Sequence, residues 1–63
     1  MDNLIRKYRE EKNLTQKELA DLVGVPCQTI AKLEQGRRIT IELSILVKIS
    51  DVLEKPLSDI FSP

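Results

Sequence analysis

Histidine and tryptophan are absent from this 63-residue sequence, and cysteine occurs only once. A single cysteine cannot form a disulfide within the chain, and without histidine an ordinary zinc site has too few ligands. Clustered carboxylates and a glycine-rich phosphate loop are missing too, so the usual catalytic apparatus is absent. We therefore expect a protein that is not an enzyme and that holds neither a metal nor another cofactor.

Long apolar runs are also missing. No stretch approaches the roughly 18 residues of a membrane span, and the N-terminus lacks the apolar region of a signal peptide. The hydrophobic content of 41% and the charged content of 32% are typical of a soluble globular protein. We expect one domain over residues 1–63, cytoplasmic in a prokaryote or phage and without membrane contact. Because so short a chain builds only a small core, a homodimer would add needed burial.

An excess of positive charge is the third feature that the sequence lacks. Ten basic residues balance ten acidic ones, whereas a basic domain would be a better indication of nucleic-acid binding. However, several basic residues lie in or just after the segment 15–36, and the acids gather mainly elsewhere. A local basic patch can survive overall neutrality.

The segment 15–36 contains two helix patterns, the first of which begins near Gln16. Thr15 and Glu18 have the spacing of a capping box, in which hydroxyl and carboxylate each satisfy a backbone N–H group. Gly24 ends this helix, because glycine readily adopts the left-handed conformation. The apolar positions in between form one stripe: Leu19, Ala20, Leu22 and Val23.

A second helix is predicted over about 26–35. Pro26 suits its first turn, Gly36 ends it, and Ile30 and Leu33 form its apolar side. Two short helices joined by so short a turn must cross steeply, which is the helix-turn-helix arrangement. The small side chain of Ala20 suits such a crossing, and the spacing of these small and apolar residues makes the prediction specific.

Three further helices are predicted outside this segment. The first has Asp2 or Asn3 as its N-cap and ends near Asn13, a residue type that often adopts the left-handed conformation there. A loop with Ile39 or Ile41 turned inward leads to the fourth helix, and a last helical turn closes the chain. The predicted fold is a compact, all-α domain of five helices with a central helix-turn-helix.

The fourth helix is expected to begin between residues 40 and 43. Its apolar coverage is wider than one core-facing stripe requires: Leu43, Leu46, Val47, Ile49, Val52 and Leu53. Either this helix is central or part of it meets a second subunit. The candidate dimer-interface residues lie here and in the last helical turn: Leu43, Leu57, Ile60 and Phe61. For the three residues of the last turn the core is the alternative, and one or two of them could serve in both places.

These patterns resemble the Cro and phage-repressor type of helix-turn-helix, often called Xre-like. The resemblance covers nearly the whole chain through REEKNLTQKELADLVGV, QTIAKLEQG and LVKISDVLEKPLSDIF. It implies a lambda-repressor-like fold and sequence-specific binding of double-stranded DNA by a homodimer on palindromic operators. We expect a repressor, and no small-molecule effector is evident from the sequence. The resemblance also implies a partly buried ion pair between Arg9 and Glu34, whereas two surface side chains are the alternative.

The resemblance places the second helix of the motif in the major groove, where its outward side chains can read base edges. Gln28 is best suited, because its amide donates and accepts at once, as adenine N6 and N7 require. Lys32 can reach a guanine or a phosphate, and Thr29 a phosphate or a thymine methyl group. An ordinary solvated helix face is the alternative for all three.

Contacts with the DNA backbone are expected around this helix. The resemblance implies that Gln16 binds the backbone and buttresses the second helix, at a helix N-terminus that favours phosphate. We expect Lys17, Arg37 and Arg38 to contact the backbone as well. Such contacts supply salt-dependent affinity and little sequence information.

Cys27 departs from the family pattern, together with Pro26 before it. Cys27 has three possible roles: an apolar base contact, a space filler, or a redox switch. An alternative function from another class is a protein-interaction module of the same fold, antitoxin-like or developmental, without base readout. A contiguous positive face around Gln16, Gln28 and Arg37 would favour DNA, and a mixed or apolar face would favour a protein partner.

Overall fold

The computed structural model describes residues 3–37 and 39–61 of the chain. These residues form five helices joined by loops, and no strand occurs among them. The helices are α1 (Ile5–Glu11), α2 (Gln16–Val23), α3 (Cys27–Glu34), α4 (Leu43–Leu53) and α5 (Leu57–Ile60). The predicted all-α, five-helix fold is confirmed. The expectations about Asp2 and Arg38 fall outside the described residues.

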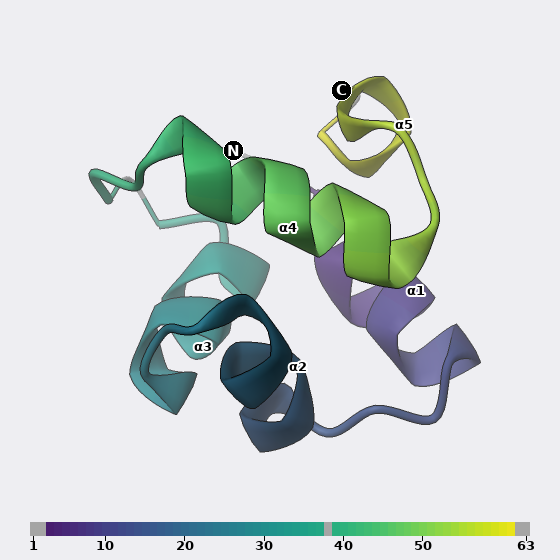
Figure 1. The fold of residues 1–63 in the computed structure, drawn as a ribbon, viewed down its shortest axis with the longest axis horizontal. Coiled ribbons are helices and arrows are strands. Elements are labelled where there is room, and N and C mark those ends of the chain that lie inside the picture. Colours follow the sequence, from purple (N-terminus) through teal and green to yellow (C-terminus); the bar gives the residue numbers. More distant parts are fainter. Residues whose placement is uncertain (1–2, 38, 62–63) are drawn as a thin grey trace.

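All five helices contribute to one hydrophobic core. In Figure 1, α4 lies across α2 and α3, and α1 and α5 lie toward the C-terminal end of α4. Helix α2 contacts both α3 and α4, while α1 contacts α3 and α5 contacts α4. The buried apolar residues are Ile5, Leu19, Ala20, Val23, Ile30, Leu33, Ile49, Leu53 and Ile60. The position of α3 therefore depends on packing against both α2 and α1.

Helix α2 begins and ends as predicted. The Thr15 hydroxyl accepts the N–H of Glu18 at 3.0 Å, and the Glu18 carboxylate accepts the N–H of Thr15 at 2.9 Å. Gly24 has a φ of 81° and closes the helix, with its N–H donated to the carbonyl of Ala20. Ala20 itself is buried, as a close helix crossing requires.

Left-handed residues also end the other two predicted helices of the N-terminal half. Asn13 has a φ of 58° after α1, and Gly36 has a φ of 74° after α3. After α3, the N–H groups of Gly36 and Arg37 donate back to the carbonyls of Leu33 and Lys32. This is the Schellman arrangement, which reverses the chain directly after a helix.

Three expectations about these helices are wrong. Leu22 is 59% exposed, because it lies roughly 100° around α2 from the middle of the buried stripe. Pro26 is the N-cap residue of α3, with ψ at 148°, and does not belong to its first turn. Ile60 is completely buried, so the core is confirmed as its place and its candidacy for the dimer surface is wrong.

Helix α4 begins at Leu43, within the predicted range. Its Ile45 packs against the core, although the sequence pattern did not single it out. Both Ile39 and Ile41 of the preceding loop pack against the core, where only one was expected. The apolar coverage of α4 thus divides into a core side and a solvent side, the latter carrying the exposed Leu43 and Val47.

Candidate nucleic-acid interface

The outer face of α3 presents two polar side chains. Ile30 and Leu33 are buried on the inner side, and Gln28 and Lys32 are exposed. Residues four apart lie on the same side of a helix, so the Gln28 amide and the Lys32 ammonium share one outward surface. Thr29 is half-buried at its flank.

Cys27 is less exposed than Gln28 and Lys32. Its side chain is half-buried and packs against the hydrophobic core. As the first residue of α3, it lies at the border of the buried stripe formed by Ile30 and Leu33. Of the three possible roles, this position supports the space filler, and the base contact stays a prediction.

Positive charge remains available around α3. Lys32 and Arg37 are exposed, and within residues 3–37 and 39–61 neither forms an ion pair. The acid of α3, Glu34, has a side chain only 5% exposed and is paired with Arg9. Arg38 lies outside the described residues. The outward charge of α3 itself therefore comes from Lys32.

The N-terminus of α2 has a more mixed character. Lys17 lies 3.0 Å from the carboxylate of Asp21, one turn along the same helix, and both side chains are exposed. The hydrogen bond with Asp21 raises the pKa of Lys17 above its ordinary value. An exposed pair of this kind is weak, so Lys17 can exchange this carboxylate for a phosphate at little cost.

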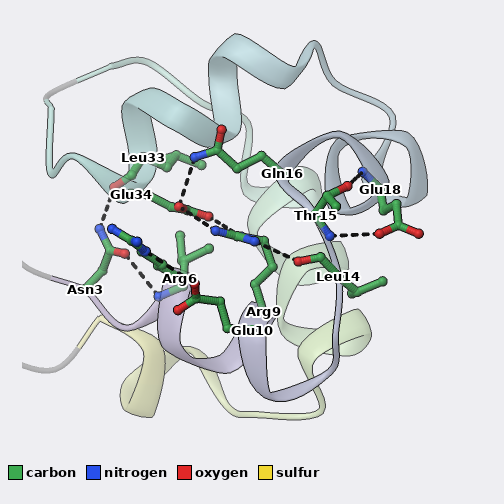
Figure 2. A network of polar contacts seen from close by, with 11 residues as sticks. Asn3, Arg6, Arg9, Glu10, Leu14, Thr15, Gln16, Glu18, Leu33 and Glu34 are labelled. Atoms are coloured by element: carbon green, nitrogen blue, oxygen red, sulfur yellow. Dashed lines mark hydrogen bonds and ion pairs between the residues drawn. The ribbon is translucent and has the colours of Figure 1, made fainter.

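Arg9 and Glu34 form the ion pair that the family resemblance implies (Figure 2). Arg9 Nε donates to Glu34 Oε2 at 2.6 Å, and Nη2 donates to Oε1 at 3.2 Å. The remaining Nη1 donates to the carbonyl oxygen of Leu14 at 2.7 Å. The Glu34 hydrogen bond raises the pKa of Arg9, against the opposing effect of burial. Because both side chains are buried, the surface alternative is wrong.

Two amide side chains extend this network around the end of α3. Gln16 Nε2 donates to Glu34 Oε1 at 3.0 Å, which joins the start of α2 to the end of α3. Asn3 Nδ2 donates to the carbonyl oxygen of Leu33 at 2.6 Å, and its Oδ1 accepts the N–H of Ile5 at 3.1 Å. The sequence indicated Asp2 or Asn3 as the N-cap of α1, but the N-cap residue is Leu4. The contact between Asn3 and Leu33 was not anticipated.

The candidate dimer residues divide by exposure. Leu43 is 68% exposed, and Leu57 and Phe61 are half-buried, whereas Ile60 is enclosed. Val47 is 43% exposed on α4, one turn from Leu43. Together Leu43 and Val47 give α4 an apolar surface that residues 3–37 and 39–61 leave exposed.

A separate hollow of about 220 Å³ lies between the C-terminal ends of α1 and α4. Its lining residues are Tyr8, Glu11, Lys12, Leu53, Glu54 and Lys55. Lys12 pairs with Glu54, and Lys55 Nζ lies 5.1 Å from the centre of the Tyr8 ring. The charges of Lys12 and Lys55 are thus already engaged, and the hollow is separate from the outer face of α3.

No helix in the described residues has the length and apolar character that crossing a bilayer needs.

The sequence model of the helix-turn-helix family matches residues 5–60. The chain belongs to this family. Within it, the match is to the Cro, C1 and Xre type. The Arg9–Glu34 pair and the glycine-terminated α2 and α3 agree with the resemblance on which the sequence interpretation relied.

Several archaeal proteins of this family are similar to the chain. One from Methanothermobacter thermautotrophicus, described as an uncharacterised HTH-type transcriptional regulator, is 60% identical over 37 residues, covering 59% of this chain and 54% of that protein. One from Archaeoglobus fulgidus, with the same description, is 39% identical over 61 residues, covering 97% and 84%. A putative HTH-type transcriptional regulatory protein of Methanocella arvoryzae is 39% identical over 54 residues, covering 86% and 16%. The chain thus spans about half of the first relative and a small part of the third.

Proposed function

We propose that this helix-turn-helix protein is a sequence-specific regulator of transcription that inserts α3 into the major groove of double-stranded DNA. The observation that carries the proposal is the outer face of α3, where Gln28 and Lys32 are exposed side by side opposite the core. An amide can bond adenine in two places, and an ammonium can bond guanine or a phosphate. The descriptions of the relatives as transcriptional regulators support the same proposal.

Contacts with the DNA backbone would hold α3 in register. Gln16 and Lys17 occupy the first turn of α2, where backbone N–H groups have no intrahelical acceptor and favour an anion. Arg37 follows α3 and is exposed, and we keep Arg38 as a further candidate from the sequence. These contacts predict an affinity that falls steeply as the salt concentration rises.

A homodimer on a palindromic operator is the assembly that we propose. The longest dimension of the domain is 25 Å, whereas half-sites of such operators lie roughly 34–36 Å apart, so each subunit would cover one half-site. The exposed Leu43 and Val47, with the half-buried Leu57 and Phe61, are the surface proposed for the second copy. A dimer that occupies an operator excludes other proteins from it, and we propose repression for this reason.

Selection of bound duplexes from a random DNA pool tests the proposed function. We expect the wild-type protein to enrich one sequence, and Gln28→Ala to lose preference at one or two adjacent base pairs while nonspecific affinity persists. The loss of one bidentate contact corresponds to about 1–3 kcal/mol of discrimination. Gln35→Ala is the matched control, because Gln35 is exposed but lies past the end of α3.

Two results would contradict the proposal. If no duplex is retained at moderate ionic strength from any pool, the protein-interaction module becomes the better interpretation. If Gln28→Ala selects the same sequence as the wild type, Gln28 does not read DNA.

A further inference from the structure

We infer that Glu34 is a positioning residue for DNA binding, because its buried carboxylate holds the Gln16 amide ready to donate to a backbone phosphate. This inference rests on the proposed function. It assigns Glu34 and Arg9 a role in DNA affinity that goes beyond holding the fold together.

Chemistry fixes which way the Gln16 amide faces. An ionised carboxylate has only acceptors, and the nearest Gln16 atom lies 3.0 Å from Glu34 Oε1. The reversed amide would place two oxygens at that separation, so the NH2 group must face Glu34. In Figure 2 the amide oxygen of Gln16 points away from the carboxylate. One N–H is used by Glu34, and the second remains to donate to a phosphate.

Arg9 holds the carboxylate that orients the amide. Its guanidinium bonds both oxygens of Glu34 and is itself tied to the carbonyl of Leu14. The Glu34 side chain is only 5% exposed and cannot turn toward solvent without breaking these contacts. Arg9 also neutralises a negative charge that would otherwise repel a phosphate at the start of α2.

The oriented amide lies where free backbone donors also gather. The capping box engages the N–H groups of Thr15 and Glu18, while those of Gln16 and Lys17 belong to the first turn and have no intrahelical acceptor. A phosphate at this point could accept from the backbone and from the Gln16 side chain together. Because Glu34 orders that side chain before DNA arrives, binding would lose less side-chain conformational entropy.

A double-mutant cycle in DNA affinity tests the inference. Gln16→Ala is expected to weaken binding to the selected duplex about tenfold, and Glu34→Gln about fivefold. In the Glu34→Gln background, Gln16→Ala should add less than about a twofold loss, because the amide is no longer positioned. A purely structural Glu34 would instead leave the effect of Gln16→Ala the same in both backgrounds.

The side-chain amide resonances of Gln16 give a second measurement, with the exposed Gln28 and Gln35 as internal references. In the wild type, the Gln16 NH2 protons should be separated from those references and exchange more slowly with solvent. In Glu34→Gln they should move toward the references. Glu34→Asp serves the same purpose if Glu34→Gln does not fold, because the shorter carboxylate keeps the charge for Arg9 and withdraws from Gln16.

Ile49→Val is the control for general destabilisation, since Ile49 is buried in α4, and the hydrogen bonds of the network involve no α4 residue. It should lower the unfolding midpoint and leave DNA affinity unchanged. An additive cycle, or Gln16 resonances that do not respond to Glu34, would overturn the inference while the DNA-binding proposal stands. A wild-type protein that binds no duplex would overturn both.

Discussion

The two helices of the motif, α2 and α3, have the same length of eight residues and are held in place by different means. Helix α2 starts with a complete capping box made by its own neighbours, Thr15 and Glu18. Helix α3 starts at Pro26, which supplies no side-chain cap. Its fixed points lie at the other end, where Glu34 and the Leu33 carbonyl bond to side chains from α2 and from the N-terminal part of the chain.

This difference suits the roles that we propose. The N-terminal half of α3 carries Gln28, the proposed base reader, and no side chain caps its start. The C-terminal end is fastened by a bidentate ion pair and by amide hydrogen bonds, which are stronger than surface contacts. The outer face of α3 can therefore stay free for DNA, while the contacts of Leu33 and Glu34 at its C-terminal end set the orientation of the helix.

Breaking the anchor of α3 should have the largest effect on stability. Arg9→Met leaves the buried Glu34 carboxylate unpaired and should cost about 3–5 kcal/mol of unfolding free energy in urea titrations. The double variant Arg9→Met/Glu34→Leu should recover part of that loss, because no charge is left stranded. Arg6→Met is the control: the Arg6–Glu10 pair lies on the surface of the same helix, so a change within about 0.5 kcal/mol is expected. Equal losses for Arg9→Met and Arg6→Met would show that the buried pair is not the anchor.

The packing between α2 and the rest of the core gives the next effect. Ala20→Leu places extra carbons at a buried position where the helices cross, and overpacking should cost about 1–3 kcal/mol in thermal unfolding. Leu22 lies two residues after Ala20 but on the exposed side of α2, so Leu22→Ala should change stability by less than about 0.5 kcal/mol. A larger loss at Leu22 than at Ala20 would contradict the observed burial.

The starts of the two helices should respond differently to capping variants. Thr15→Ala removes the α2 cap and should cost about 1 kcal/mol. At α3, Pro26→Ser adds a cap but also frees the unfolded chain, so Pro26→Ala is needed to isolate the cap. We expect Pro26→Ser to be more stable than Pro26→Ala by about 1 kcal/mol in chemical unfolding. No difference between the two would mean that α3 cannot use a local cap.

The smallest effect on stability is expected for Lys17→Met. The Lys17–Asp21 pair is fully exposed, so the unfolding midpoint should not move measurably at neutral pH. Because Asp21 raises the Lys17 pKa in the folded state, any contribution is present at neutral pH and is lost only as the pH rises above 10.5. In DNA titrations, the same variant should make the slope of log affinity against log salt concentration shallower by about 1, the value of one phosphate contact, on every duplex. An unchanged salt dependence would remove Lys17 from the backbone contacts.

Local preferences made the ends of the helices predictable. The Thr15 capping box and the left-handed Asn13, Gly24 and Gly36 follow from backbone and side-chain chemistry within a few residues. The outward position of Gln28 and Lys32 followed from helical spacing once Ile30 was known to face inward. Helical spacing also placed Arg9 four residues after Ile5, on the core-facing side where a charge must be paired, and the resemblance supplied its partner Glu34.

The environment of several residues depended on segments far away in the sequence. Asn3 reaches a carbonyl 30 residues further along the chain, and no local pattern contains that partner. Leu22 was placed in the apolar stripe although it is exposed, and Ile60 was kept as a dimer candidate although it is buried, because helical spacing gives the direction of a side chain but not what another helix places there. The sequence by itself determined where each helix of the motif starts and stops, since those choices are local. Only the tertiary structure decided which side chains share the core and which carboxylate orients Gln16, because burial and long-range hydrogen bonds exist only after distant segments have packed together.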